Sequence, residues 1–129
     1  MKYMILMNTT ATNWGSFDQL TPEEIRKHVQ FMKGLNAELA ASKELVDAVG
    51  LTPPNLAKTV RAQPGGAPVV TDGPFPETKE FLAGFWLLEL RTPERAVEIA
   101  AKISTAPGQG GRPMNFLVEI RPVGQAPEV

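Results

Sequence analysis

The sequence predicts an α+β domain with the ferredoxin-like, split β-α-β arrangement: one antiparallel sheet with two helices on one face. Two observations predict it. Strand and helix patterns follow one another as β-α-β-β-β-β-α-β along 129 residues. Both helical segments begin with the same triplet, Thr-Pro-Glu, at 21–23 and 92–94. Each triplet offers a hydroxyl N-cap followed by proline at the first helical position.

The two helices are the most strongly specified elements. A helix is predicted from about 22 to 41, where Thr21 and Glu24 can form a capping box. Apolar side chains recur along it at helical spacing and predict a stripe that faces the sheet. A second helix is predicted from about 93 to 104, capped by Thr92. The members of the apolar stripe are Ile25, Val29, Met32, Leu35 and Leu39.

Strands are predicted at 2–7, 43–51, 56–63, 67–73, 80–90 and 114–123, with loops at 8–20 and 106–113. The strands at 2–7 and 80–90 are apolar on both faces, whereas two helices cover only one face of a sheet. The other face therefore needs a cover. We expect a second copy of the chain, so that two sheets pack face to face in a homodimer of the dimeric α+β barrel type. A ligand cavity on that face of a monomer is the alternative.

Composition narrows the classes of function. The length suits a single domain over 1–129, and the absence of cysteine excludes disulfides, iron–sulfur clusters and thiol catalysis. A net charge of −1 and a pI near 5.8 argue against nucleic acid as a partner. The longest apolar run is too short to span a membrane, so we expect a cytoplasmic protein. With one histidine and no suggestive carboxylate spacing, we expect neither a metal site nor a cofactor.

The single histidine, His28, falls on the apolar stripe of the first helix and should point toward the sheet. One interpretation is a partly buried core histidine held by a nearby hydrogen bond. The other is a general acid or base at the floor of a pocket, because imidazole titrates near neutral pH. Position along the helix leaves both interpretations open.

A second group of candidates surrounds the segment 69–90, which reads VVTDGPFPETKEFLAGFWLLEL. Asp72 ends an apolar strand and either caps a Asp-Gly turn or places a carboxylate at a pocket mouth. Phe75, between two prolines, is either a plug on the core or an apolar wall of that pocket. Arg61 and Arg121 are candidates for holding a carboxylate-bearing ligand by two-point contact. For Arg121 the alternative is an exposed ion pair with Glu119, two residues away on the same strand face.

The same segment resembles the signature of the DGPF group within the YCII-related proteins, through Asp72-Gly73-Pro74-Phe75, the flanking ETKE and the following Gly84-Phe85. The segments KYMILM, HVQFMKGLNAEL and VEIRPV are similar too. The resemblance implies the ferredoxin-like fold and dimerisation. It also implies small enzymes with a His–Asp pair, including a lactone dehydrochlorinase-type activity, while other members occur beside extracytoplasmic-function sigma factors. The helix histidine of the family pattern matches His28, and we assign the carboxylate to Asp72.

These observations favour a small cofactor-independent enzyme. His28 would move a proton, Asp72 would orient the imidazole from the rim of a cleft, and arginine would hold a small anionic substrate. Isomerisation or elimination needs no more than these groups. The alternative is a ligand-binding or protein-interaction module that works with a transcription factor, and a third possibility is a structural dimer without a pocket.

Overall fold

The computed structural model describes residues 1–10, 17–73 and 80–128. Four strands form an antiparallel sheet in the order β2-β5-β1-β6. They are β1 (Lys2–Thr10), β2 (Leu45–Gly50), β5 (Glu80–Glu89) and β6 (Leu117–Pro122). Because β5 lies between β1 and β2, and β1 lies between β5 and β6, the two β-α-β halves interleave. The predicted ferredoxin-like fold is therefore confirmed.

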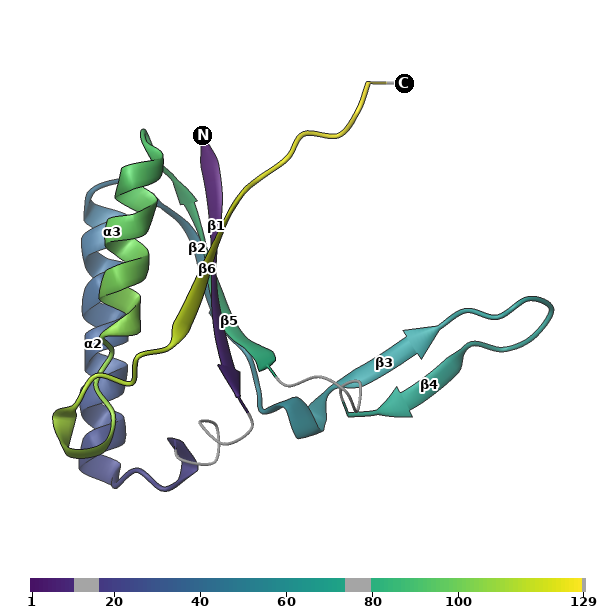
Figure 1. Cartoon of the computed structure of the whole chain (residues 1–129), viewed down its shortest axis with the longest axis horizontal. Coiled ribbons are helices and arrows are strands. Elements are labelled where there is room, and N and C mark those ends of the chain that lie inside the picture. The colour runs from purple at the N-terminus through teal and green to yellow at the C-terminus, as the bar shows by residue number, and fades with distance from the viewer. Residues whose placement is uncertain (11–16, 74–79, 129) are drawn as a thin grey trace.

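Both helices lie on one face of this sheet (Figure 1). The helix α2 (Pro22–Ala41) begins with the predicted capping box: the Thr21 hydroxyl accepts from the Glu24 amide, and the Glu24 carboxylate accepts from the Thr21 amide. The helix α3 (Pro93–Ser104) begins after Thr92, whose hydroxyl accepts from the Arg95 amide. Neither helix, within the described residues, is long and apolar enough to cross a membrane.

The hydrophobic core lies between the helices and the sheet. Ile5 of β1 and Leu88 of β5 are fully buried there, against Leu39 of α2 and Ile103 of α3. One expectation about the stripe on α2 was wrong: Ile25 and Val29 are 36% and 40% exposed. The buried line follows His28, Leu35 and Leu39 instead, with Met32 packed beside it. Ile25 and Val29 fall to one side of that line, because a helix turns about 100° per residue.

The two remaining strands form a separate sheet. The strands β3 (Lys58–Arg61) and β4 (Val69–Asp72) pair only with each other, after a short 3-10 turn η1 (Pro54–Leu56). Their hairpin projects from one end of the main sheet to the side opposite the helices, and the C-terminal tail extends to that same side (Figure 1). Val60 and Val70 are 65% and 56% exposed on the hairpin. It therefore adds little to the core of its own chain.

Candidate functional site

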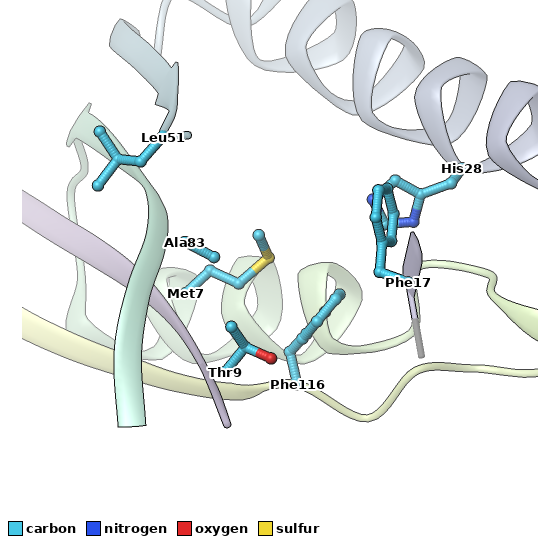
Figure 2. A pocket seen from close by; sticks show the side chains of 7 residues that line it. All are labelled: Met7, Thr9, Phe17, His28, Leu51, Ala83 and Phe116. Carbon is cyan, nitrogen blue, oxygen red and sulfur yellow. The ribbon is translucent and has the colours of Figure 1, made fainter. Parts of the chain in front are cut away.

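A pocket opens between the N-terminal half of α2 and the end of the sheet from which the hairpin leaves. Its volume is about 190 Å³. Figure 2 shows His28 and Phe17 beside each other at one end and Leu51 at the other. The wall is almost entirely apolar, and Thr9 and His28 supply its only polar side chains among the described residues. The described residues that line it are Met7, Thr9, Phe17, His28, Leu51, Ala83 and Phe116.

The imidazole of His28 is held in one orientation. Its Nδ1 lies 3.0 Å from the carbonyl oxygen of Pro107. A carbonyl only accepts, so Nδ1 carries the proton and the neutral ring keeps a lone pair on Nε2. The edges of two rings pack near it: the ring centroid of Phe17 lies 5.1 Å away and that of Phe116 6.3 Å away. The ring thus has a defined tautomer and little freedom to turn.

The other ring nitrogen, Nε2, has no hydrogen-bond partner among the described residues. Across those residues, no buried side-chain nitrogen or oxygen is left without a partner. His28 itself is only 7% exposed and lines the pocket. The accessible part of Nε2 therefore opens into the pocket, where it is available as a hydrogen-bond acceptor or a base.

Burial lowers the pKa of His28 below its usual 6.5, because an imidazolium loses hydration in an apolar site. The Pro107 carbonyl acts in the opposite direction, since its hydrogen bond favours the charged ring, and it is the weaker of the two effects. The ring is accordingly neutral at pH 7, with Nε2 ready to accept a proton.

The loop after α3 positions the Pro107 carbonyl. Glu24, at the start of α2, accepts from the Gly110 amide at 2.6 Å with the oxygen that the capping box leaves free. The Met114 amide donates to the Ala106 carbonyl at 2.9 Å, which closes the loop at its base. Gly110 adopts a φ of 63°, a conformation that suits glycine. The glycine-rich segment therefore serves to fix the histidine tautomer.

A β-bulge shapes the floor of the pocket. On β1, Met7 pairs with Gly84 and the next residue, Asn8, pairs with Leu82, so Ala83 is an extra residue on β5. Ala83 is buried and lines the pocket, and its carbonyl accepts from the Leu51 amide at 2.8 Å. Small side chains here leave space that larger ones would fill.

A second cavity of about 210 Å³ adjoins the first and shares Met7 and His28 with it. Its polar group is the side-chain amide of Asn36, whose oxygen accepts from Trp86 Nε1 at 2.8 Å. Gly84 forms part of its wall, and a Cβ there would lie 2.8 Å from the Val49 carbonyl oxygen. His28 thus stands between two cavities that run along the inner side of the sheet.

The structure brings His28 to a pocket, but it does not bring Asp72, Arg61 or Arg121 to that pocket within one chain. Asp72 lies on the hairpin, its side chain 84% exposed, and its carboxylate accepts from Lys58 Nζ at 2.6 Å. Arg61 lies on the same hairpin, and neither residue lines the His28 pocket. Phe75, the predicted plug or pocket wall, lies outside the described residues.

Arg121 lies on β6, on the sheet face away from the helices, because it pairs with Met4 and not with a core residue. Its Nε is 3.8 Å from the Glu119 carboxylate, and both side chains are at least half exposed. This is the exposed ion pair that the sequence offered as the alternative. Arg61 and Arg121 belong to different sheets, so one chain does not assemble them into a two-point anion site.

Several pocket residues were missed by sequence reasoning. Phe17 and Phe116 flank the imidazole. Phe17 lies in the predicted loop 8–20, where an aromatic residue isolated among polar ones was the available signal, because such a side chain needs an apolar partner. Phe116 lies in the predicted last strand, 114–123, which gave no sign that it would reach the histidine. Pro107 contributes only a backbone carbonyl, which no side-chain pattern can predict.

No cluster of three or more potential metal ligands (His, Cys, Asp or Glu) occurs within residues 1–10, 17–73 and 80–128.

Fold and site together define a ferredoxin-like α+β protein with one histidine aimed into an apolar pocket. The model of the YCII-related domain family matches residues 1–111, and the chain belongs to this family. An uncharacterised protein of Rhizobium meliloti (strain 1021) is 30% identical over 101 residues, which cover 78% of this chain and 77% of that protein. The resemblance to the YCII-related family is thereby confirmed, while membership of its DGPF group stays a prediction.

Proposed function

We propose that the chain is a small, cofactor-independent enzyme that moves a proton on a small molecule bound beside His28. One observation carries the proposal: the Pro107 carbonyl holds the proton on Nδ1, so the free lone pair of Nε2 opens into an apolar pocket. A histidine that only fills a core would also hold a hydrogen bond such as the one to Pro107, but it would not need to line a cavity of about 190 Å³.

The proposed reaction needs one base that removes a proton from the substrate and can return it at another atom. Nε2 accepts a proton from a carbon or oxygen acid of the substrate and becomes an imidazolium, whose Nδ1–H stays bound to the Pro107 carbonyl. The electron pair left on the substrate shifts along the molecule. The imidazolium then returns the proton at another atom, which completes an isomerisation. In an elimination, the electron pair left on the substrate forms the new double bond, the bond to the leaving group breaks and the leaving group takes that bond's electron pair. The imidazolium later gives its proton to water or to the leaving group.

The rate should depend on pH in a defined direction. Only neutral His28 is a base, and burial lowers the pKa of His28 below 6.5. The rate should therefore be flat from neutral pH down to below 6.5 and fall only as the pH passes through the lowered pKa.

The test is proton exchange with solvent. Neutral enolisable ketones and lactones would be incubated in D2O with the protein, and loss of the acidic C–H signal followed by NMR. His28→Gln should lower the enzymatic rate by about 10²- to 10⁴-fold, the usual contribution of a positioned base. Lys33→Gln, on the exposed side of the same helix, is the matched control. Equal rates for His28→Gln and wild type would show that His28 is not the base.

A homodimer forms part of this proposal. The chain exposes 8870 Å², whereas a compact monomer of 14.0 kDa exposes about 6,700 Å². The excess, about 2,200 Å² by that relation, suits a partner that covers the open sheet face, the hairpin and the tail. On that face Leu6 and Phe85 are only half-buried. An isolated two-stranded hairpin with exposed valines also gains stability from a partner.

Whether the predicted His–Asp pair forms, and whether an arginine can hold an anionic substrate at the pocket, depends on the proposed dimer. In one chain Asp72 and Arg61 lie on the projecting hairpin, so they would meet a His28 pocket only if a second copy carried its hairpin there. Light scattering should give about twice the 14.0 kDa chain mass. Phe85→Lys should reduce that mass to the monomer's, while Val97→Lys, on an exposed site of α3, should not. A wild-type monomer at micromolar concentration would contradict the dimer.

The predicted alternative, a binding module without catalysis, has one observation in its favour. Apart from His28, no titratable side chain lines the pocket among the described residues, so a second acid or base is missing there. Saturable binding without any proton exchange above the buffer rate would favour that alternative.

A further inference from the structure

The walls of the His28 pocket indicate what kind of molecule it accepts. An apolar cavity of about 150 Å³ is known to take up benzene in another protein. The pocket here has about 190 Å³ and is lined by Met7, Leu51 and Phe116 among other apolar side chains. It therefore has room for one six-membered ring with one or two small substituents.

The histidine offers the pocket an acceptor. The Nδ1 proton of His28 is already donated to Pro107, so what remains on the imidazole for a ligand is the lone pair of Nε2. The Thr9 hydroxyl lies 3.4 Å from the Thr10 carbonyl, and at that distance it can turn either to donate to a ligand or to accept from one. A ligand that satisfies Nε2 must bring an O–H or N–H.

The charge balance of the pocket disfavours an anion. No lysine or arginine is among the described lining residues, and burial keeps the only ionisable one, His28, in its neutral form. A carboxylate taken from water into such a wall without a paired cation loses hydration that nothing replaces.

We propose that the pocket binds a neutral, planar ring of benzene size that donates one hydrogen bond to His28 Nε2, as a phenol or an enol would. The ring would lie against Phe116 and Met7, with Phe17 packed on the edge of the imidazole. This inference rests on the proposed function, since it names the substrate class for the same histidine. The proton that Nε2 removes would then be the one already hydrogen-bonded to it.

Three compounds of similar size test the proposal: phenol, anisole and benzoate. His28 is the only histidine, so its side-chain NMR signals report binding without ambiguity. At pH 7.5 phenol should give a saturable shift. Anisole, which lacks the donor, should bind about three- to tenfold more weakly, the worth of one net hydrogen bond. Benzoate should bind at least about tenfold more weakly than phenol, because its charge is unpaired.

Two variants sharpen the test. His28→Phe keeps an aromatic ring but removes the acceptor, so the preference for phenol over anisole should disappear while both still bind; binding would then be followed on ligand signals. Ala83→Leu places a larger side chain in the pocket and should weaken all three compounds. The fold of each variant would be checked by its amide spectrum.

The outcomes separate the proposals. Benzoate binding as tightly as phenol, anisole matching phenol, or phenol failing to shift His28 up to its solubility limit would each overturn the neutral-donor inference. Phenol binding as expected without proton exchange on any substrate would leave the ligand class intact and overturn only the catalytic function.

Discussion

The two faces of the sheet differ in how far the chain completes them. On the helix side, the side chains of Ile5 and Leu88 are fully buried within one chain. On the other side, their neighbours Leu6 and Leu87 are only half-buried, and a hairpin and a tail extend away over the same side (Figure 1). The helix side therefore explains why the monomer folds and where the pocket forms. The open side is left partly exposed by its own chain, and it is the surface that we propose a second copy covers.

The largest expected effect contrasts two adjacent leucines on β5. Leu88→Ala should destabilise the fold by roughly 2–5 kcal/mol, because it leaves a cavity in the core. Leu87→Ala, on the open face, should cost about 1 kcal/mol or less in the isolated chain. Urea unfolding at several protein concentrations measures both. If a second copy covers the open face, the Leu87 cost should grow with concentration, whereas the Leu88 cost should not.

If Leu87→Ala and Leu88→Ala lowered the free energy of unfolding equally at low protein concentration, Leu87 would be buried within one chain. The two faces of the sheet would then not differ as described. A Leu87 cost that is the same at every concentration would argue against the dimer alone.

The second effect is an ion pair on the helix side. The Glu44 carboxylate accepts two hydrogen bonds from the Arg95 guanidinium, at 2.8 and 2.9 Å. These two bonds, together with one from the Ser42 hydroxyl, lower the pKa of Glu44 to about 2. Glu44→Gln should cost roughly 1–3 kcal/mol at pH 6. A lowered carboxyl pKa stabilises above the unfolded value, here 4.5, and that stabilisation is lost as the pH falls from 4.5 toward 2. The difference between wild type and variant should therefore shrink at pH 3.

The control for this pair is Glu98→Gln, which removes a more exposed partner of the same arginine and should cost less than Glu44→Gln. If the difference in free energy of unfolding between wild type and Glu44→Gln stayed constant from pH 6 to pH 3, the charge of Glu44 would not be what stabilises the fold.

The helix side was also the more predictable side. Thr21 and Thr92 specify the helix starts through local hydrogen bonds, and both helices were correctly placed. Apolar alternation located the strands, but it ended the first one too early: β1 runs to Thr10, into the segment predicted as a loop, because polar residues pair there with β5. The position of His28 on its helix was likewise readable. Its partner was not, because Pro107 lies 79 residues away and contributes a backbone carbonyl. The position of Asp72 relative to His28 was not readable either, because the Asp-Gly pattern indicates a turn but not the direction in which a hairpin projects.

A smaller effect is expected at the start of α2. Thr21→Ala removes the hydroxyl that accepts from the Glu24 amide and should cost roughly 0.5–2 kcal/mol. Because Glu24 also holds Gly110, the loop that carries Pro107 should loosen, and amide exchange at Met114 should accelerate. Thr92→Ala removes the matching cap on α3 and should leave Met114 unaffected. Equal acceleration in both variants would indicate general destabilisation instead of a linked loop.

The smallest expected effect concerns the carboxylate that the sequence paired with His28. Asp72 lies on the hairpin and is bound to Lys58, and it is not among the groups that shift the pKa of His28. In a monomer, Asp72→Asn should leave that pKa almost unchanged, because Asp72 is exposed on a separate sheet, is paired with Lys58 and has its charge screened by water and salt. Histidine titration by NMR measures this directly, since the chain has one histidine.

A dimer in which the partner's hairpin reaches the pocket predicts a different result: loss of the nearby negative charge should lower the pKa of His28 by about 1 or more. Repeating the Asp72→Asn titration in the Phe85→Lys variant, which should be monomeric, then separates the two cases. A pKa shift that depends on the hairpin of a second copy must disappear when the dimer dissociates. An Asp72 effect that survives in the monomer would contradict the separation of the hairpin from the pocket within one chain.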